Sequence, residues 1–389
     1  MPSLRPFPRR RSADRLRVAI ITEAFLPAVN GVTNSVVRAA EYLRREGHEV
    51  IIVAPGPGPT DHDGIPVVRI RSVSLPRYRE VRVGLATLRL TSVLRSFRPD
   101  VVHLAAPTVL GAAGARAAAT LGIPAVSVFQ TDLVGFARRY GLSLAAGPLW
   151  AWARWIHRQT AVTLAPSSST MWSLRAHGIP RVHLWQRGVD LERFSPAHRC
   201  DDLHRRYAPC DEVVVGFVGR LAKEKQVERL RAVATIPGVQ VVIVGDGPER
   251  HRLERELPTA VFTGQLTGHE LARHVATFDV FVHTGLDETF CQAVQEALAS
   301  GVPVVAPAAG GPLDLVSHGV NGYLWSPEQP ETLAGAVQHL VESPLLRRTL
   351  AGAARGSVDH RTWPAVMAQL VEWYRFAIDG GGRVERIAA

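Results

Sequence analysis

The chain has 389 residues, of which 46% are apolar and 21% are charged, a composition that predicts a soluble α/β protein with about two domains. Its three cysteines form no C-x-x-C pair and leave an odd one, so neither a disulfide framework nor a zinc site is indicated. The formal net charge of +10 leaves nucleic acid, anionic lipid and phosphorylated ligands open as partners.

Residues 1–15 are basic and rich in proline, and we expect them to be a disordered N-terminus. The apolar run after them has the length of one strand, which is too short for a signal-peptide core or a membrane span. Together with the unpaired cysteines, this predicts a reduced, cytoplasmic setting.

Residues 16–195 alternate between apolar strands and helical patterns, and we expect them to form an N-terminal Rossmann-like domain. The first strand, 16–22, is followed by a helix and a second strand, which implies a parallel sheet with a right-handed crossover. Asn30 and Gly31 lie in the first strand-to-helix turn. Glycine there permits close approach to a ligand, and the amides that follow are expected to receive a phosphate.

Residues 196–211 lose the apolar pattern, so a linker is expected there. The strand-helix alternation then resumes in residues 212–362, with helices expected at 226–236 and 289–300 among others. Residues 363–389 begin with a helical pattern that can pack back on the N-terminal domain. The prediction is an α/β fold with two doubly wound Rossmann-like domains facing each other across a cleft.

Candidate ligand-binding residues follow the ends of several predicted strands, where ligands bind in sheets of this kind. These residues are Asn30, Gln130, Asp132, Arg220, Lys225, Gly245, Asp246, Gly247, Asp287 and Glu288. Lys223 and Lys225 are the only lysines in an arginine-rich chain, which indicates a position suited to a compact ammonium.

The stretch from residue 285 to 322 contains Glu288 and Glu296 around the start of a predicted helix. Their backbones are expected to lie roughly 12 Å apart at 1.5 Å rise per residue. That separation suits a nucleotide sugar, with the amides near Phe290 and Cys291 on a phosphate. The alternative is that both glutamates are surface charges.

Three motifs in the C-terminal half, FVGRLAKEK, GDGPER and ETF…EALASGVPVVAP, are followed by Gly310-Gly311 and Asn321-Gly322. With AFLPAVNGV and FQTD in the N-terminal half, they resemble the retaining family 4 glycosyltransferases of GT-B fold. FQTD, ETFCQAVQEALASG and PAAGGPLDLV are most similar to actinobacterial GDP-mannose-dependent α-mannosyltransferases that act on glycolipids. The nucleotide and the sugar follow from this resemblance alone.

The resemblance implies a role for each matched residue. Arg220 and Lys225 would neutralise the departing diphosphate. Glu288 would bind sugar hydroxyls and Glu296 the ribose, and Gly31 would close on the diphosphate from the other domain. The further donor-binding positions are Gly245, Asp246, Gly247, Asp287, Phe290 and Cys291, and the acceptor positions are Asn30, Gln130 and Asp132.

The resemblance also bears on the mechanism. Without a clear protein nucleophile, retention indicates front-face attack, in which the leaving phosphate helps to deprotonate the acceptor. No cofactor or metal is then required, and Asp61-His62-Asp63 lies in a loop, unlike metal-binding D-x-D motifs that end a strand.

Two positions depart from the family pattern. Gln130 stands where many members have histidine, so only hydrogen bonding remains there. Cys291 replaces a common glycine, which crowds the loop but leaves its amide available.

The expected acceptor is a lipid-linked one at the membrane surface, of the glucuronosyl diacylglycerol or phosphatidylinositol type. Residues 76–82 and 150–158 mix aromatic residues with arginine, as suits a peripheral protein on the inner face of the plasma membrane. The alternative interpretation of the second stretch is that its tryptophans pack within the fold, between the sheet and the surface. The sequence indicates no oligomeric state.

Rival functions remain open from the sequence. The nearest is a UDP-sugar-dependent GT-B glycosyltransferase, and a GT-B-like epimerase or an inactive sugar-binding relative is another. A basic nucleic-acid-binding protein is disfavoured because the arginines are scattered and no recognition motif is present. Nucleic acid is therefore not expected as a partner.

Overall fold

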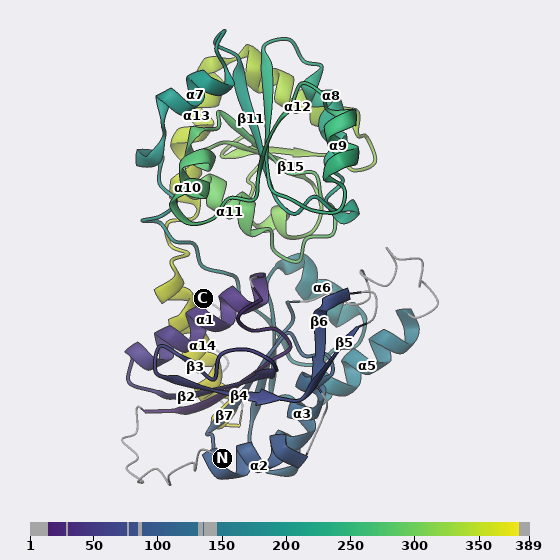
Figure 1. Cartoon of the computed structure of the whole chain (residues 1–389), viewed down its shortest axis with the longest axis vertical. Coiled ribbons are helices and arrows are strands. Elements are labelled where there is room, and N and C mark those ends of the chain that lie inside the picture. The colour runs from purple at the N-terminus through teal and green to yellow at the C-terminus, as the bar shows by residue number, and fades with distance from the viewer. Residues whose placement is uncertain are drawn as a thin grey trace.

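The structure is a computed structural model that describes residues 15–28, 30–75, 78–84, 88–130, 135 and 146–380. The chain forms two α/β domains, stacked along the long axis of the molecule (Figure 1). Each has a parallel sheet with helices around it, and the predicted GT-B architecture is confirmed. The expected disordered N-terminus lies outside the described residues, apart from Arg15.

The N-terminal sheet has the strand order β10-β9-β8-β7-β1-β2-β4-β3, and its pairs are parallel except β3 with β4. Its central strands are buried on both faces because helices cover each side. The strands are β1 (Arg17–Thr22), β2 (Glu49–Pro55), β3 (Asp61–His62), β4 (Ile65–Ile70), β7 (Val101–Ala105), β8 (Ala125–Val128), β9 (Val162–Ala165) and β10 (Val182–Leu184).

The helices of this domain are α1 (Gly31–Arg45), α2 (Leu88–Phe97), α3 (Leu110–Thr120), α5 (Ala146–Arg158) and α6 (Ser168–Ala176). A separate antiparallel pair consists of β5 (Ser72–Leu75) and β6 (Tyr78–Gly84). In register, Ile20 of β1 pairs with Ile52 of β2 and His103 of β7, so the middle of the sheet is aligned across three strands.

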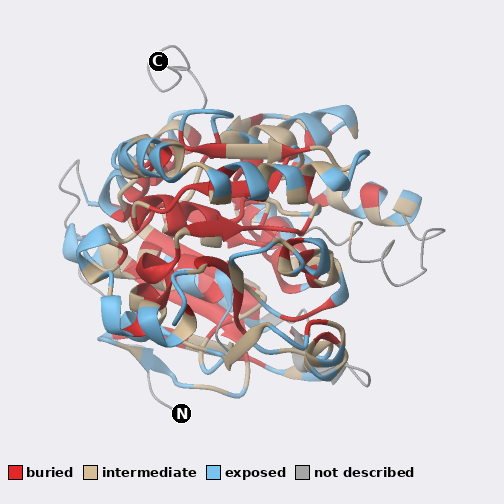
Figure 2. Ribbon diagram, turned by 90° about the horizontal axis from the view of Figure 1, so that it is seen from above, coloured by how far each residue is buried: buried red, intermediate tan, exposed pale blue. Residues whose placement is uncertain are grey.

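The C-terminal sheet has the order β13-β12-β11-β14-β15-β16, all parallel. Its buried strands run between layers of helices whose outer faces are exposed (Figure 2). The strands are β11 (Val213–Val218), β12 (Val239–Val244), β13 (Val261–Gly264), β14 (Val280–Val282), β15 (Val304–Pro307) and β16 (Gly322–Trp325). The helices are α7 (Asp201–Tyr207), α8 (Leu230–Ala234), α9 (Arg250–Glu256), α10 (Gly268–Thr277), α11 (Gln292–Ala299), α12 (Glu331–Glu342) and α13 (Pro344–Ala354).

The chain passes between the domains twice, on neighbouring segments. Trp185 belongs to the N-terminal core and Val189 to the C-terminal core, so the first crossing lies between them. Near the second crossing, Val189 N donates to Arg361 O at 2.8 Å. The helix α14 (Trp363–Ile378) then packs on the N-terminal domain, where its Tyr374 hydroxyl lies 2.7 Å from His103 Nδ1.

Three local expectations differ from the structure. Residues 196–211, expected as a linker, contain α7, which packs on α10 within the C-terminal domain. The helix expected at 226–236 is shorter than expected: Gln226 is left-handed with φ 48° and does not begin it, residues 227–229 form a 3-10 turn, and α8 covers only Leu230–Ala234. The helix expected from 289 begins only at Gln292, because Cys291 has φ 79° and cannot continue a helix.

Among the described residues, no helix is both long enough and apolar enough to cross a bilayer.

Candidate active site

The two domains touch at the loops that follow their strands. The carboxylate of Asp314 accepts from Ser168 N at 2.6 Å, at the start of α6. Thr170 Oγ1 donates to Thr289 O at 3.3 Å, and Gln292 Nε2 of α11 donates to Gly188 O at 3.1 Å. These bonds join α11, the loop before it and the turn that contains Asp314 to the loops and the helix start on the N-terminal side.

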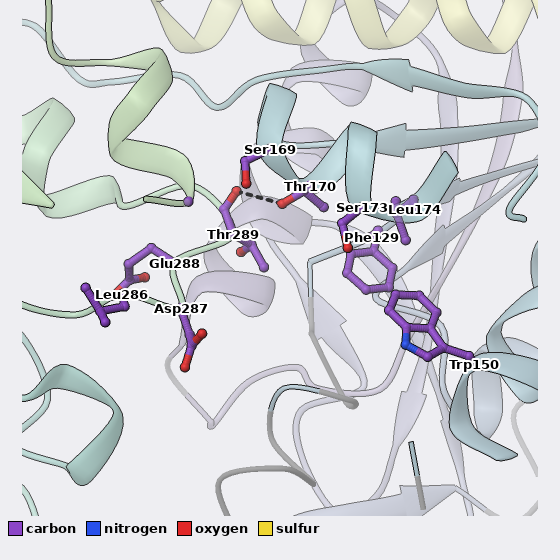
Figure 3. Close-up of a pocket in the computed structure, with 11 residues that line it drawn as sticks. Phe129, Trp150, Ser169, Thr170, Ser173, Leu174, Leu286, Asp287, Glu288 and Thr289 are labelled. Atoms are coloured by element: carbon purple, nitrogen blue, oxygen red, sulfur yellow. Dashed lines mark hydrogen bonds between the residues drawn. The ribbon is translucent and has the colours of Figure 1, made fainter. Parts of the chain in front are cut away.

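A pocket of about 220 Å³ lies at this contact and is shared by the two domains (Figure 3). The C-terminal domain contributes the loop from Leu286 to Thr289 and Gly310. The N-terminal domain contributes an aromatic pair and a row of hydroxyls, which are Phe129, Trp150, Ser169, Thr170 and Ser173. The predicted interdomain cleft therefore contains Asp287 and Glu288.

Glu288 is flanked by two cationic groups. Lys225 Nζ donates a hydrogen bond to Glu288 Oε1, and His283 Nε2 lies 3.2 Å from the same oxygen. Burial alone would raise the pKa of Glu288, but Lys225 and His283 lower it far below its usual range. Glu288 is therefore ionised at neutral pH, with its charge fixed at the rim of the pocket.

The two partners of Glu288 respond to its charge in the same sense. Burial would lower the pKa of Lys225, but Glu288 and Cys291 raise it above its ordinary value. Burial would also lower the pKa of His283, but Cys291 and Glu288 raise it to about 9. The Glu288 carboxylate is thus held between the ammonium of Lys225 and the imidazole of His283.

The loop that carries Arg220 and Lys225 is supported by the Gly245-Asp246-Gly247 turn. A Cβ at Gly245 would lie 1.9 Å from Gly219 O, so only glycine permits this approach. Leu221 N donates to Asp246 O at 2.9 Å, and Asp246 Oδ1 accepts from Gly247 N at 2.7 Å. Arg220 remains exposed, and Thr284 Oγ1 fixes the backbone oxygen of Lys225 at 2.6 Å.

The loop from Glu288 to Cys291 is shaped by the Gly310-Gly311 turn. Gly311 N donates to Glu288 O at 2.8 Å, and a Cβ at Gly311 would lie 2.0 Å from Phe290 O. Phe290 and Cys291 are both buried. Cys291 has a left-handed conformation with φ 79°, which glycine alone adopts without strain. The amides of 289–291 therefore belong to a loop, and the helix N-terminus lies after them.

Glu296 lies on α11, one residue after Gln295. Burial raises its pKa to about 7, while a hydrogen bond from Gln292 and the nearby charge of Arg193 oppose that rise. Glu296 is thus poised between its neutral and ionised forms at neutral pH. The side chain of Glu296 is partly buried, so it is not the fully exposed surface charge of the alternative interpretation.

On the N-terminal side, Asn30 serves as the cap of α1. Its Oδ1 accepts from Val32 N at 3.0 Å and Thr33 N at 2.9 Å, so these two amides, expected to receive a phosphate, are already bonded. Gln130 is buried, and its Oε1 accepts from Arg187 Nη2 at 2.5 Å. Asp132 lies outside the described residues.

The sequence matches two family profiles that together cover most of the chain. Glycosyltransferase Family 4 matches residues 29–193, and Glycosyl transferases group 1 matches residues 202–357. This chain belongs to glycosyltransferase family 4. The predicted resemblance is therefore confirmed.

Curated members of the family are similar over nearly the whole length. A GDP-mannose-dependent alpha-mannosyltransferase of Mycobacterium tuberculosis is 51% identical, covering 92% of this chain and 96% of its own. One of Mycolicibacterium smegmatis is 52% identical, covering 92% and 97%. The sulfoquinovosyl transferase SQD2 of Arabidopsis thaliana is 33% identical, covering 91% and 72%.

The fold is also that of solved glycosyltransferase structures. Anabaena Alr3699/HepE in complex with UDP superposes with a TM-score of 0.78 at 21% identity, covering 92% of this chain and 100% of that chain. At this identity the likeness establishes the fold alone.

Among the residues that the structure describes, two groups of side chains are close enough to hold a metal ion, and one of them is in the site. It consists of His283, Glu288 and Cys291, whose ligand atoms lie within 4.8 Å of one another. A divalent cation there would have to displace Lys225 and the proton of His283 from Glu288. The other group, Glu41, His62 and Asp63, includes two residues of the D-x-D segment, which was expected to be a loop but whose Asp61 and His62 form the short strand β3.

Two residues of the site were missed at the sequence level. His283 directly follows the apolar residues of β14, so in the sequence it reads as part of a buried strand. Arg187 follows β10, at the same edge of the sheet as the other cleft residues. That position after a strand was the feature of the sequence that could have identified it. The chain contains many arginines, so the sequence alone does not distinguish Arg187 from the others, and its role in the site is seen only in the structure.

Proposed function

We propose that this chain is a retaining glycosyltransferase that transfers mannose from GDP-mannose to a membrane glycolipid. Three actinobacterial relatives named GDP-mannose-dependent alpha-mannosyltransferase support this, at 45–52% identity over 92% of the chain. The structural observation that carries the proposal is Glu288, held ionised by Lys225 and His283 at the rim of the interdomain pocket.

In the free protein the Lys225 ammonium is paired with Glu288. In this proposal the ammonium pairs with the diphosphate of the donor instead. The Lys225 ammonium and the exposed Arg220 neutralise the leaving group as the bond from the anomeric carbon to the phosphate oxygen breaks. The electron pair of that bond goes to the phosphate. The acceptor oxygen bonds to the anomeric carbon from the same face, and its proton passes to the leaving phosphate. The reaction then needs no metal or other cofactor.

Glu288 and Glu296 bind the two ends of the donor. Glu288, freed from Lys225, accepts hydrogen bonds from the sugar hydroxyls. Glu296 accepts hydrogen bonds from the ribose, and the loop amides near Phe290 and Cys291 contact the distal phosphate. The buried environment of Glu296 makes this contact dependent on pH.

The acceptor headgroup enters the pocket from the N-terminal side. Phe129 and Trp150 offer aromatic faces for a sugar ring, and the hydroxyls of α6 offer hydrogen bonds. The same helix that places Trp150 in the pocket wall exposes Trp152 and Trp155, whose rings stack at 5.0 Å. The acceptor is therefore taken from a lipid surface next to α5, on the cytoplasmic face of the plasma membrane.

Two interpretations of residues 150–158 were given from the sequence, a membrane-facing surface and packing within the fold, and each fits some of the tryptophans. Trp150 is packed within the fold, whereas Trp152 and Trp155 are 41% and 39% exposed. Trp172 of α6 is 62% exposed and lies beside Arg175 at 5.3 Å. The other expected membrane stretch, residues 76–82, has side chains outside the described residues.

Transfer can be tested with GDP-mannose labelled in the sugar and a panel of acceptors, namely glucuronosyl diacylglycerol, phosphatidylinositol and diacylglycerol. The proposal predicts a lipid-soluble mannoside with an α linkage in the product spectrum. Labelled UDP-glucose serves as the competing donor. Transfer from UDP-glucose alone, or a β-linked product, would contradict the proposal.

Membrane association is tested by sedimentation with vesicles. The double variant Trp152→Ser/Trp155→Ser is expected to reduce binding to phosphatidylglycerol vesicles by about tenfold, since each exposed tryptophan contributes apolar contact at an interface. Leu345→Ser, at a 73% exposed position on α13, is the control and should bind as the wild type does. Equal binding of all three proteins would argue against a lipid-facing α5.

A further inference from the structure

Arg187 lies in the cleft on the N-terminal side, just after β10. Its Nη2 donates to Gln130 Oε1 at 2.5 Å. A Cβ at Gly31 would lie 3.0 Å from its Nη1, so the guanidinium rests against the first residue of α1. The absence of a side chain at Gly31 is what leaves room for it. One guanidinium thus joins three elements of the N-terminal domain.

The C-terminal domain holds the same residue by its backbone. Gln295 Nε2 of α11 donates to Arg187 O at 3.1 Å, and Gln292 Nε2 donates to the next carbonyl, Gly188 O, also at 3.1 Å. The helix that carries Glu296 therefore sets the position of Arg187.

The charge of Arg187 is preserved in this setting. Burial lowers its pKa to about 10 while Glu288 acts to raise it, so Arg187 is a cation at neutral pH. Among the described residues, no carboxylate lies within 4.0 Å of it to form an ion pair. Its hydrogen-bond partner there is a neutral amide, which orients the guanidinium without cancelling its charge.

We propose that Arg187 is a third cation for the leaving diphosphate, supplied by the N-terminal domain opposite Arg220 and Lys225, and that Gln130 positions it. This rests on the proposed function, in that the ligand is a nucleoside diphosphate sugar. With the domains closed on the donor, the diphosphate is neutralised from both sides of the cleft. A bidentate guanidinium suits phosphate oxygens, and its effect grows as the bond to the sugar breaks.

The proposal predicts that Arg187 contributes to binding of the diphosphate and not of the nucleoside. Comparing the affinities of the full-length protein for GDP and GMP measures the two contributions separately. Arg187→Ala is expected to weaken GDP binding by about 10- to 100-fold, the effect of one charge-assisted hydrogen-bonded contact. GMP, which lacks the second phosphate, should bind within about twofold of the wild type. The kcat for transfer should fall by about 10²-fold, and guanidinium ion added in solution should restore part of it.

Two further variants make the test specific. Arg187→Lys keeps the charge without the planar fork, and its preference for GDP over GMP should lie between those of the wild type and Arg187→Ala. Arg231→Ala, which removes an exposed cation of an ion pair on α8, should leave both nucleotides unaffected. If GDP and GMP weaken together in Arg187→Ala, the residue is only structural and the proposal is wrong. Unchanged GDP binding would overturn it equally.

If the wild type prefers uridine nucleotides, UDP and UMP replace GDP and GMP in the same comparison. A failure of the proposed donor is then distinguishable from a failure of the role of Arg187. The first changes which base binds, and the second removes the dependence on the second phosphate.

Discussion

Lys225→Ala removes an ammonium group that pairs with Glu288 in the free protein. In the complex with donor, the same ammonium would pair with the diphosphate. Two effects follow from the structure. The side chains of Lys225 and Glu288 are 24% and 16% exposed, so the pair is partly hydrated. His283 remains beside Glu288 in the variant. We therefore expect a loss of about 2 kcal/mol in the free energy of unfolding, below the value for breaking a fully buried pair.

The loss has a defined dependence on pH. The pKa of Glu288 is lowered in the folded state, so its ion pair contributes stability above its ordinary value of 4.5. This contribution disappears as pH falls and Glu288 takes up a proton. The difference in unfolding free energy between the wild type and Lys225→Ala should thus be largest near pH 7 and shrink below about pH 4.

The kinetic effect is separate, because it acts on the transition state. Removing one group that stabilises the leaving charge should lower kcat by about 10²-fold at saturating donor. Lys223→Ala is the matched control, since Lys223 is exposed and lies two residues earlier on the same turn. Denaturant unfolding and turnover of labelled donor measure the two effects. If Lys225→Ala retained the kcat and the unfolding midpoint of the wild type, the reasoning would be refuted.

Two further substitutions probe the donor loops. In the wild type, GDP affinity should rise with pH through about 7 as Glu296 ionises, whereas Glu296→Gln should bind more weakly and without this dependence in calorimetry. Because the raised pKa of Glu296 makes folding less favourable as pH rises from 4.5 to about 7, the gain in stability of Glu296→Gln over the wild type should be greater at pH 8 than at pH 5. Gly311→Ala should cost about 2–4 kcal/mol of stability and at least about tenfold in GDP affinity, since its Cβ would meet Phe290 O at 2.0 Å. Gly335→Ala, in α12 with no atom within 4 Å of the added Cβ, should be neutral or slightly stabilising by comparison, and equal effects of the two would contradict this account.

The fold could be predicted from the sequence because it follows from the order of local strand and helix patterns along the chain. Apolar runs of strand length alternate with helical patterns through both domains, and such alternation has few solutions besides parallel sheets. The motif residues were accessible for a related reason. They follow strands, and the carboxyl ends of parallel strands share one edge, so Lys225 and Glu288 are brought together although 63 positions apart.

What the sequence could not provide depends on backbone conformation and on contacts between the domains. The start of α11 depends on the left-handed Cys291, which the local helical pattern does not reveal. The segment 196–211 is polar on average, yet α7 within it finds an apolar surface on α10. The pairing of Arg187 with Gln130 joins residues 57 positions apart, and no local pattern reports such a contact.

The central claim is that the cleft binds a guanosine diphosphate sugar. It is tested most directly by calorimetric titration of the wild-type protein with GDP, GDP-mannose, UDP and UDP-glucose. The account predicts that GDP and GDP-mannose bind at least about tenfold more tightly than the uridine pair, a difference of about 1.4 kcal/mol. Tighter binding of UDP and UDP-glucose would contradict it.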